Sequence, residues 1–250
     1  MWTRGLSATS GGARIRATHR VFLLNPTVPD PLAVTAPPPT APPPPEERFH
    51  ELKFVLEPDR AARVERFAAE TFGTVGKTSS ATTLLFLDTA GLHMARRLGE
   101  LRRERFRVRR EGEGGTVLLE RKTKRGDRAR LRSSPIDLGD LPRLGTTAVD
   151  PEWPGRRFHR HVVEHGLRPV CCVSFSRRVF AGAGPDGPVR IAFDRELRGE
   201  LGGAWSLRPV ATGTDLLKGR VLVEVRFPEI LPFSFRALVA EMRLDPASFS

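Results

Sequence analysis

Polar and apolar residues alternate along much of this chain. In RERFRVRR, residues 103–110, arginine occupies every second position, and Phe106 and Val108 lie between the arginines. Because successive side chains of an extended strand point to opposite faces, these arginines share one face and the apolar side chains share the other. The segment therefore predicts an amphipathic strand, and the question is which of its two faces is buried.

The same period of two predicts further strands, and a helical period predicts three helices. The strands are expected at residues 48–56, 81–89, 103–110, 116–124, 127–133, 170–180, 188–195 and 219–227. The helices are expected at 58–73, 155–166 and about 229–243. Because strands seldom alternate with helices in this order, we predict an α+β fold with an antiparallel sheet rather than a parallel Rossmann-like sheet.

Basic side chains share a face in most of these strands, with isolated acidic residues among them. The aligned positions are Phe49, Glu51 and Lys53; Arg103, Arg105, Arg107 and Arg109; Glu120, Lys122 and Lys124; Arg128, Arg130 and Arg132; Phe175 and Arg177; Arg190, Ala192 and Asp194; and Lys218, Arg220, Leu222, Glu224 and Arg226. Two arrangements fit such faces: an amphipathic sheet with solvated charges, or a closed barrel with the charges inside. The excess of arginine and lysine favours the barrel, where a bound polyanion neutralises the buried cations.

The net charge also indicates an anionic partner. The formal charge is +12 and the pI is near 11.1, which makes nucleic acid, anionic lipid and phosphate compounds the partner classes to consider. Nucleic acid is disfavoured, since the chain has no RNA-binding sheet signature and the glutamates among the arginines repel a phosphate backbone. Cys171 and Cys172 are adjacent and cannot form a disulfide framework, which indicates a reducing cytoplasm. No apolar stretch approaches the ~20 residues of a membrane span.

The N-terminal part differs in composition from the rest. Residues 26–47 are rich in proline and poor in aromatic residues, so they are unable to form a core. We therefore expect a disordered tail over residues 1–46 and one folded domain over residues 47–250.

Two short motifs do not carry a site. TFGTVGKTS, residues 71–79, resembles a phosphate-binding P-loop, but Thr71 stands at the first glycine position and a helix rather than a strand precedes it. RRFHRHVVEH contains three histidines, but its helical spacing, few carboxylates and lack of cysteine indicate a solvated basic helix rather than a metal site.

Eight motifs follow one another in order over residues 47–250. They are RFHELKF, LLFLDT, RFRVRR, LLERKTKRGDRARLR, LRPVCCVSFSRRVF, VRIAFDREL, VLVEVRFPEILP and DPASFS. Together they resemble the polyphosphate polymerase domain of the vacuolar transporter chaperone (VTC) family, a branch of the triphosphate tunnel metalloenzymes. The resemblance implies an antiparallel β-barrel tunnel with flanking helices, whose basic walls hold a nucleoside triphosphate and a growing polyphosphate chain.

The resemblance also implies roles for individual residues. The residues expected to act in catalysis, by position in the family motifs, are Arg107, Arg109, Lys122, Arg177 and Arg190. Lys53 matches the first-strand lysine, and Arg226 stands where a late-strand lysine is expected, so both are expected to bind substrate. The strand alternation adds Lys124, Arg130 and Lys218 to the substrate-binding set.

The acidic residues of these strands are the candidate metal ligands. Glu224 matches the family's late-strand glutamate, which holds a divalent metal, and Glu51 and Glu120 are expected to support it. Carboxylates on a phosphate-binding wall suit Mn²⁺ or Mg²⁺. The chain also departs from the family pattern. It contains no tyrosine, and Phe49 stands at the first acidic position of the wider superfamily's Glu-x-Glu-x-Lys strand.

The expected function is that of a metal-dependent polyphosphate polymerase, which transfers the γ-phosphate of ATP to a growing polyphosphate chain. Two alternatives stay open: a triphosphate hydrolase of the same fold, and a non-catalytic sensor that binds polyphosphate or an inositol phosphate. The expected partners are ATP and polyphosphate. We further expect a cytoplasmic monomer without a membrane span of its own, which is compatible with a partner in a membrane.

Overall fold

The computed structural model describes residues 46–72, 78–184 and 187–247. Most of the expected proline-rich tail, residues 1–45, and the centre of the P-loop-like motif, residues 73–77, lie outside the described residues. The predicted strands and helices are all present, and their ends differ from the predicted ones by a few residues.

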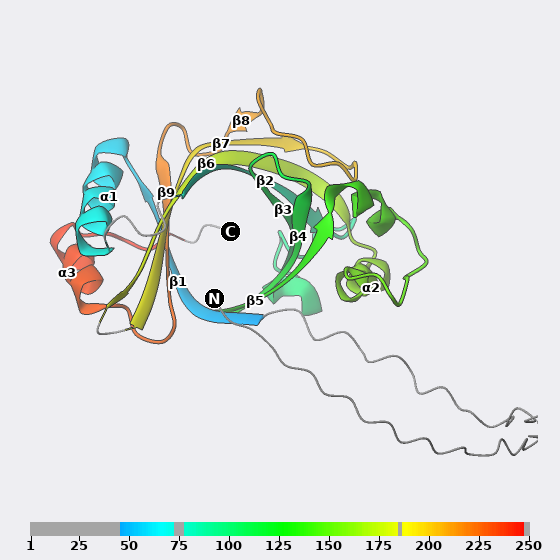
Figure 1. Ribbon diagram of the computed structural model, residues 1–250, viewed down its shortest axis with the longest axis horizontal. Helices are drawn as coiled ribbons and strands as arrows, with labels where there is room; N and C mark the ends of the chain where they lie inside the picture. The colour runs from blue at the N-terminus through cyan, green and yellow to red at the C-terminus, as the bar shows by residue number, and fades with distance from the viewer. Residues whose placement is uncertain (1–45, 73–77, 185–186, 248–250) are drawn as a thin grey trace, which may run out of the picture. The chain divides into compact units, whose positions relative to one another are not determined.

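The strands form one antiparallel sheet that closes on itself (Figure 1). In sheet order β6, β2, β3, β4, β5, β1, β9 and β7 are neighbours, and the pairing of β6 with β7 closes the barrel; β8 pairs with β7 outside this ring. The bounds are β1 (Glu46–Leu56), β2 (Thr78–Asp88), β3 (Glu104–Glu111), β4 (Thr116–Arg125), β5 (Arg128–Asp137), β6 (Arg168–Gly184), β7 (Gly187–Leu201), β8 (Thr214–Asp215) and β9 (Val221–Phe227). Closure gives every barrel strand an inner and an outer face.

Helices cover the outer face on two sides of the barrel (Figure 1). On one side α1 (Pro58–Phe72) and α3 (Phe233–Glu241) share a buried apolar cluster with outward residues of β1, β7 and β9. On the other side α2 (Arg156–His165) and two 3₁₀ helices, η1 (Glu100–Arg103) and η2 (Leu138–Gly145), share a second cluster with β2, β3 and β4. The apolar cores of this protein therefore lie mainly between the barrel and its helices.

The structure answers the question of the arginine-rich strand β3, because both of its faces are buried. Phe106 and Val108 point outward and are 1% and 0% exposed, and Phe106 packs edge-on against Phe158 of α2. Arg107 and Arg109 point into the barrel, where Arg107 lies opposite Glu120 of β4. Arg103, which was expected on the same face, is exposed and belongs to the 3₁₀ helix that precedes β3. The prediction of a barrel with charged inner walls is confirmed.

Strand β5 overturns one part of that prediction. Its inward residues are the apolar Ala129 and Leu131, which pack with Phe49 of β1. Arg130 points outward, where its side chain is 47% exposed and pairs with Glu46. The assignment of Arg130 to the substrate-binding wall is wrong, because alternation shows which residues share a face but not which face becomes the inside.

Lys218 is the second correction. It was expected on the strand that contains Glu224, but that strand begins only at Val221, and Lys218 lies in the preceding turn with a φ of 52°. Oδ1 of Asp215 accepts the backbone N–H of Lys218 and thereby shapes the turn. Lys218 is exposed and does not belong to the inner face of β9.

Candidate functional site

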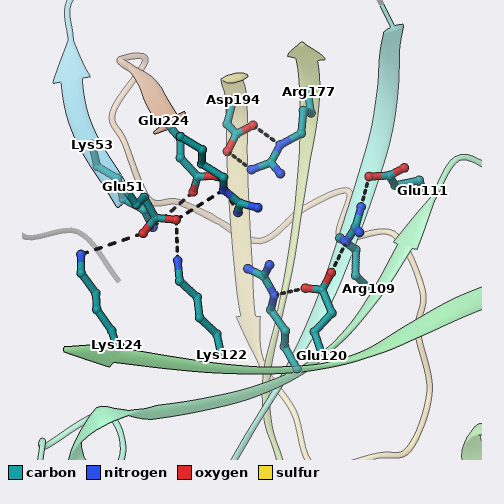
Figure 2. A network of polar contacts seen from close by, with 12 residues as sticks. Glu51, Lys53, Arg109, Glu111, Glu120, Lys122, Lys124, Arg177, Asp194 and Glu224 are labelled. Atoms are coloured by element: carbon teal, nitrogen blue, oxygen red, sulfur yellow. Dashed lines mark hydrogen bonds and ion pairs between the residues drawn. The ribbon is translucent and has the colours of Figure 1, made fainter. Parts of the chain in front are cut away.

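The interior of the barrel collects charged side chains from strands that are distant in sequence (Figure 2). The inward position of each follows from the strand register, since residues that face each other across a strand pair lie on the same side of the sheet. The inward cations that were predicted are Lys53, Arg107, Arg109, Lys122, Lys124, Arg177, Arg190 and Arg226. The carboxylates among them are Glu51, Glu111, Glu120, Asp194 and Glu224.

Two arginines of β3 share one carboxylate. Nε of Arg107 donates to Oε2 of Glu120 at 2.6 Å, and Nε of Arg109 donates to Oε1 at 2.7 Å. The Glu120 side chain is fully buried. Burial by itself would raise the pKa of this carboxyl, but the two guanidinium groups lower it to about 2. Arg109 also pairs with Glu111 at the end of β3.

A second cluster surrounds Glu51 of β1. Nζ of Lys122 donates to Oε1 of Glu51 at 2.5 Å, and Nζ of Lys53 and Lys124 each lie 3.9 Å from Oε2. Burial lowers the pKa of Lys122 to about 8, although Glu224 and Glu51 act in the opposite direction. Lys124 is the most accessible of these cations, with 44% of its side chain exposed.

Glu224 of β9 lies next to this cluster. Its Oε2 is 3.6 Å from Nζ of Lys53, and its Oε1 is 2.7 Å from Nη2 of Arg226. Burial would raise the pKa of Glu224, but the cations around it, first Arg226 and then Lys53, hold it well below its usual range. The contact with Arg226 is an ion pair by distance only, because Oε1 of Glu224 accepts no hydrogen bond among the described residues.

The Glu224 carboxylate therefore fits a divalent cation. A buried carboxylate oxygen that accepts no hydrogen bond keeps a lone pair for a hard cation, and Glu51 offers a second carboxylate close to the same lysine, Lys53. Glu120 differs, since each of its oxygens already accepts a charge-assisted hydrogen bond. The residues present would thus hold Mn²⁺ or Mg²⁺ at Glu224 with Glu51.

Arg177 and Arg190 differ in how their charge is balanced. Arg177 of β6 forms a buried two-point pair with Asp194 of β7. Arg190 of β7 has no hydrogen bond or ion pair within the part of the chain that the structure describes. Burial lowers the pKa of Arg190, and the neighbouring charges of Arg226 and Arg177 lower it further. Arg190 is thus an inward cation that forms no ion pair with any of the described residues.

Two acidic partners were not assigned a role from the sequence. Asp194 was recognised as sharing a face with Arg190, but its pairing with Arg177 depends on β6 and β7 being neighbours. Glu111 ends the arginine-rich strand, one residue beyond the predicted end of that strand. The alternation placed Asp194 on the correct face, but nothing local could identify its partner.

The histidines of α2 lie outside the barrel. His159 is buried and hydrogen-bonds to the Thr146 carbonyl at 2.8 Å. His161, Glu164 and His165 have ligand atoms within 4.8 Å of one another, but Nη1 of Arg121 already lies 2.8 Å from Nε2 of His161. The helix is basic, as predicted, but the face that contains Phe158, His159 and Val162 is buried rather than solvated.

Among the described residues, none of the helices combines the length and the apolar character needed to cross a membrane.

Comparison with known proteins identifies the fold and the family. A family model described as "VTC domain" matches residues 48–250. A solved structure named "putative adenylate cyclase" from Bacillus halodurans is similar, with a TM-score of 0.52 and 9% identity over 82% of this chain and 95% of that one. A second solved structure is that of HpAC1 from Hippeastrum, a putative adenylyl cyclase said to reveal a dominant triphosphatase activity. It is similar with a TM-score of 0.44 and 15% identity over 81% of this chain and 92% of the HpAC1 chain. No curated protein matches the chain.

Proposed function

The chain belongs to the VTC domain family, and from this premise we propose that it is a metal-dependent polyphosphate polymerase that moves the γ-phosphate of ATP onto a growing polyphosphate chain. The observation that carries the proposal is the buried cationic interior of the barrel. Cations outnumber carboxylates on its inner walls, and burying them without a ligand is unfavourable. A linear polyanion supplies the missing negative charge along the whole interior.

The proposal gives the basic residues a defined task. Phosphoryl transfer requires reactants held in line and neutralisation of the charge on the equatorial oxygens, rather than covalent chemistry by the protein. Arg107, Arg109 and Arg190 keep terminal guanidinium nitrogens without partners among the described residues, so they can donate directly to phosphate oxygens. Lys122 and Arg177, each paired with a carboxylate in the absence of a ligand, complete the basic set.

Substrate binding and metal binding are assigned to neighbouring residues. Lys53, Lys124 and Arg226 line the same wall as the candidate metal ligands and bind further phosphates of the chain. Glu224 and Glu51 hold a divalent cation, which when bound neutralises phosphate charge as a Lewis acid. The nucleophile is a terminal phosphate oxygen of the acceptor chain: a new bond forms to the γ-phosphorus, the bond between the β,γ-bridging oxygen and that phosphorus breaks, and ADP leaves.

The location and assembly follow as part of the same proposal. An ATP-consuming enzyme with two free cysteines suits the cytoplasm, and we expect it to act there as a monomer.

One incubation tests the proposed function. The purified full chain is incubated with ATP and Mn²⁺ or Mg²⁺, and long-chain polyphosphate, ADP and free phosphate are measured. Polymer together with ADP is the expected result. Free phosphate without polymer would favour a triphosphate hydrolase, and binding of ATP without turnover would favour a sensor. Failure to bind either ATP or tripolyphosphate would contradict the proposal in every form.

A further inference from the structure

Glu120 occupies an unusual position in the barrel wall. Its side chain is 0% exposed, and its two oxygens are taken by two different arginines of the neighbouring strand β3. Arg107 is its direct cross-strand neighbour, whereas Arg109 lies one inward position further along β3. A single carboxylate thus bridges two inward guanidinium groups that would otherwise repel each other. Figure 2 shows its contact with Arg109.

The side of each guanidinium that contacts Glu120 determines which side is left for a ligand. Both arginines use Nε for Glu120. The terminal nitrogens of Arg107 have no partner among the described residues, and Arg109 uses Nη1 for Glu111 and keeps Nη2. Each guanidinium therefore keeps terminal N–H groups that can donate to phosphate oxygens.

We propose that Glu120 is a positioning residue, which holds Arg107 and Arg109 as one phosphate-binding fork and does not ligate the metal. The proposed function supplies only the nature of the ligand, a chain of phosphates. The orientation of the fork is a property of the protein without ligand. The expected metal role of Glu120 is not part of this proposal, because two arginines already balance its charge and each contacts one of its oxygens.

Glu120→Gln tests the proposal, because the proposal and simple electrostatics predict opposite changes in the affinity for tripolyphosphate. The amide keeps the shape of the side chain and can accept one Nε–H through its oxygen, but its NH₂ group faces the other Nε–H and cannot accept it. One arginine loses its orientation, so tripolyphosphate should bind about tenfold more weakly in the absence of metal. Charge alone predicts the opposite, because a negative charge has been removed from a cationic interior.

Glu111→Gln is the matched control. It removes the same charge next to the same Arg109, but from a side chain that is 47% exposed at the end of the strand. Because Glu120 still holds Arg109, tripolyphosphate should bind Glu111→Gln as tightly as the parent or more tightly. Glu120→Asp keeps the charge but is one methylene shorter, so its affinity should fall between those of the parent and Glu120→Gln.

A second measurement does not depend on the ligand. In ¹⁵N-labelled parent protein the two Nε–H signals of Arg107 and Arg109, assigned by replacing each with lysine, should be protected from solvent exchange. At least one of them should lose its protection in Glu120→Gln, while circular dichroism and the melting curve verify that the variant is folded.

The outcomes separate this inference from the proposed function. Weaker metal-free binding with a lost Nε–H signal supports it. Equal or tighter binding with both signals retained overturns it, and so does an effect that occurs only when Mn²⁺ is present. If the signals behave as expected but the parent binds no tripolyphosphate, the positioning of the arginines by Glu120 is supported and the proposed function is contradicted.

Discussion

Asp194 of β7 holds Arg177 of β6 through two parallel hydrogen bonds, one of 2.6 Å from Nε to Oδ1 and one of 2.7 Å from Nη2 to Oδ2. The guanidinium also lies 5.0 Å above the ring of Phe175. Both partners are buried, with 8% and 2% of their side chains exposed. The pair neutralises itself inside the barrel and differs in this respect from Arg190.

The first prediction follows from this pair. Asp194→Ala leaves Arg177 charged and buried without its carboxylate, so it should lower the free energy of unfolding by about 3–5 kcal/mol. Urea denaturation followed by circular dichroism measures the change. Replacing both residues, as Arg177→Met with Asp194→Leu, should recover most of the loss, since no charge then remains unpaired. A double variant that is less stable than Asp194→Ala would show that the pair contributes more than mutual neutralisation.

The second prediction compares two arginines on opposite faces of the barrel wall. Arg190 points inward and has no ion pair within the part of the chain that the structure describes. A charge-assisted hydrogen bond to phosphate contributes roughly 1.5–3 kcal/mol. Arg190→Ala should therefore weaken tripolyphosphate binding by about 10-fold to 150-fold in calorimetry. Arg130→Ala removes the same charge from the outer face and should change the affinity by less than about twofold. Equal effects of the two substitutions would mean that only net charge matters.

The third prediction concerns the candidate metal ligand. Glu224→Gln keeps the size of the side chain but removes an anionic ligand, so Mn²⁺-dependent turnover of ATP should be lost. Metal-free binding of tripolyphosphate should stay the same or become tighter, because the cationic interior has lost one negative charge. Calorimetry with and without Mn²⁺ and an assay for ADP measure the two effects. Turnover at the parent rate would exclude Glu224 as the metal ligand.

The fourth prediction uses the pKa of Glu120. Two arginines lower it from 4.5 to about 2, so the folded state binds this proton less readily than the unfolded state does. The ionised Glu120 therefore stabilises the protein above pH ~4.5, and this contribution is lost as the pH falls toward 2. Its full size is about 3 kcal/mol, of which about 2 kcal/mol disappears between pH 5 and pH 3.

Urea unfolding at pH 5 and pH 3 checks this prediction against Glu120→Gln. The other carboxylates titrate in both proteins, so the difference between the two isolates the contribution of residue 120. The parent should lose about 2 kcal/mol more than the variant over this interval. An equal loss in both proteins would show that the Glu120 carboxyl is not held ionised by Arg107 and Arg109.

The predicted strands agree with the observed ones because side chains alternate between the two faces of a strand with a period of two residues. On β9 the valines at 221, 223 and 225 point outward into the apolar cluster with α1 and α3, while Glu224 and Arg226 point inward. A period of two separates such sets wherever a segment is extended, whatever the rest of the fold does. The sequence alone therefore grouped most of the inward residues of β3, β4, β7 and β9, although it added Arg103 and Lys218, which lie outside these strands.

The segments without a regular period were harder to predict. The two-residue strand β8 and the 3₁₀ helices η1 and η2 were not anticipated. Lys218 was assigned to a strand, because KGRVLVEVRF alternates from its first residue, yet Asp215 accepts the N–H groups of Leu217, Lys218 and Gly219 and forms a turn there. Hydrogen bonds from the backbone to a side chain can form a turn in place of strand pairing, and the alternation of polar and apolar residues does not reveal such a turn.

By itself the sequence determined which side chains share a face, because alternation is a local property of an extended chain. Tertiary structure decided which face is inside and which charges meet. On β5 the inner face is apolar, since Ala129 and Leu131 pack with Phe49, and Arg130 instead pairs with Glu46 on the outside. The sharing of Glu120 by two arginines and the pairing of Arg177 with Asp194 likewise depend on which strands are neighbours and in what register. Register and closure are set by the packing of the whole barrel, so no local pattern contains them.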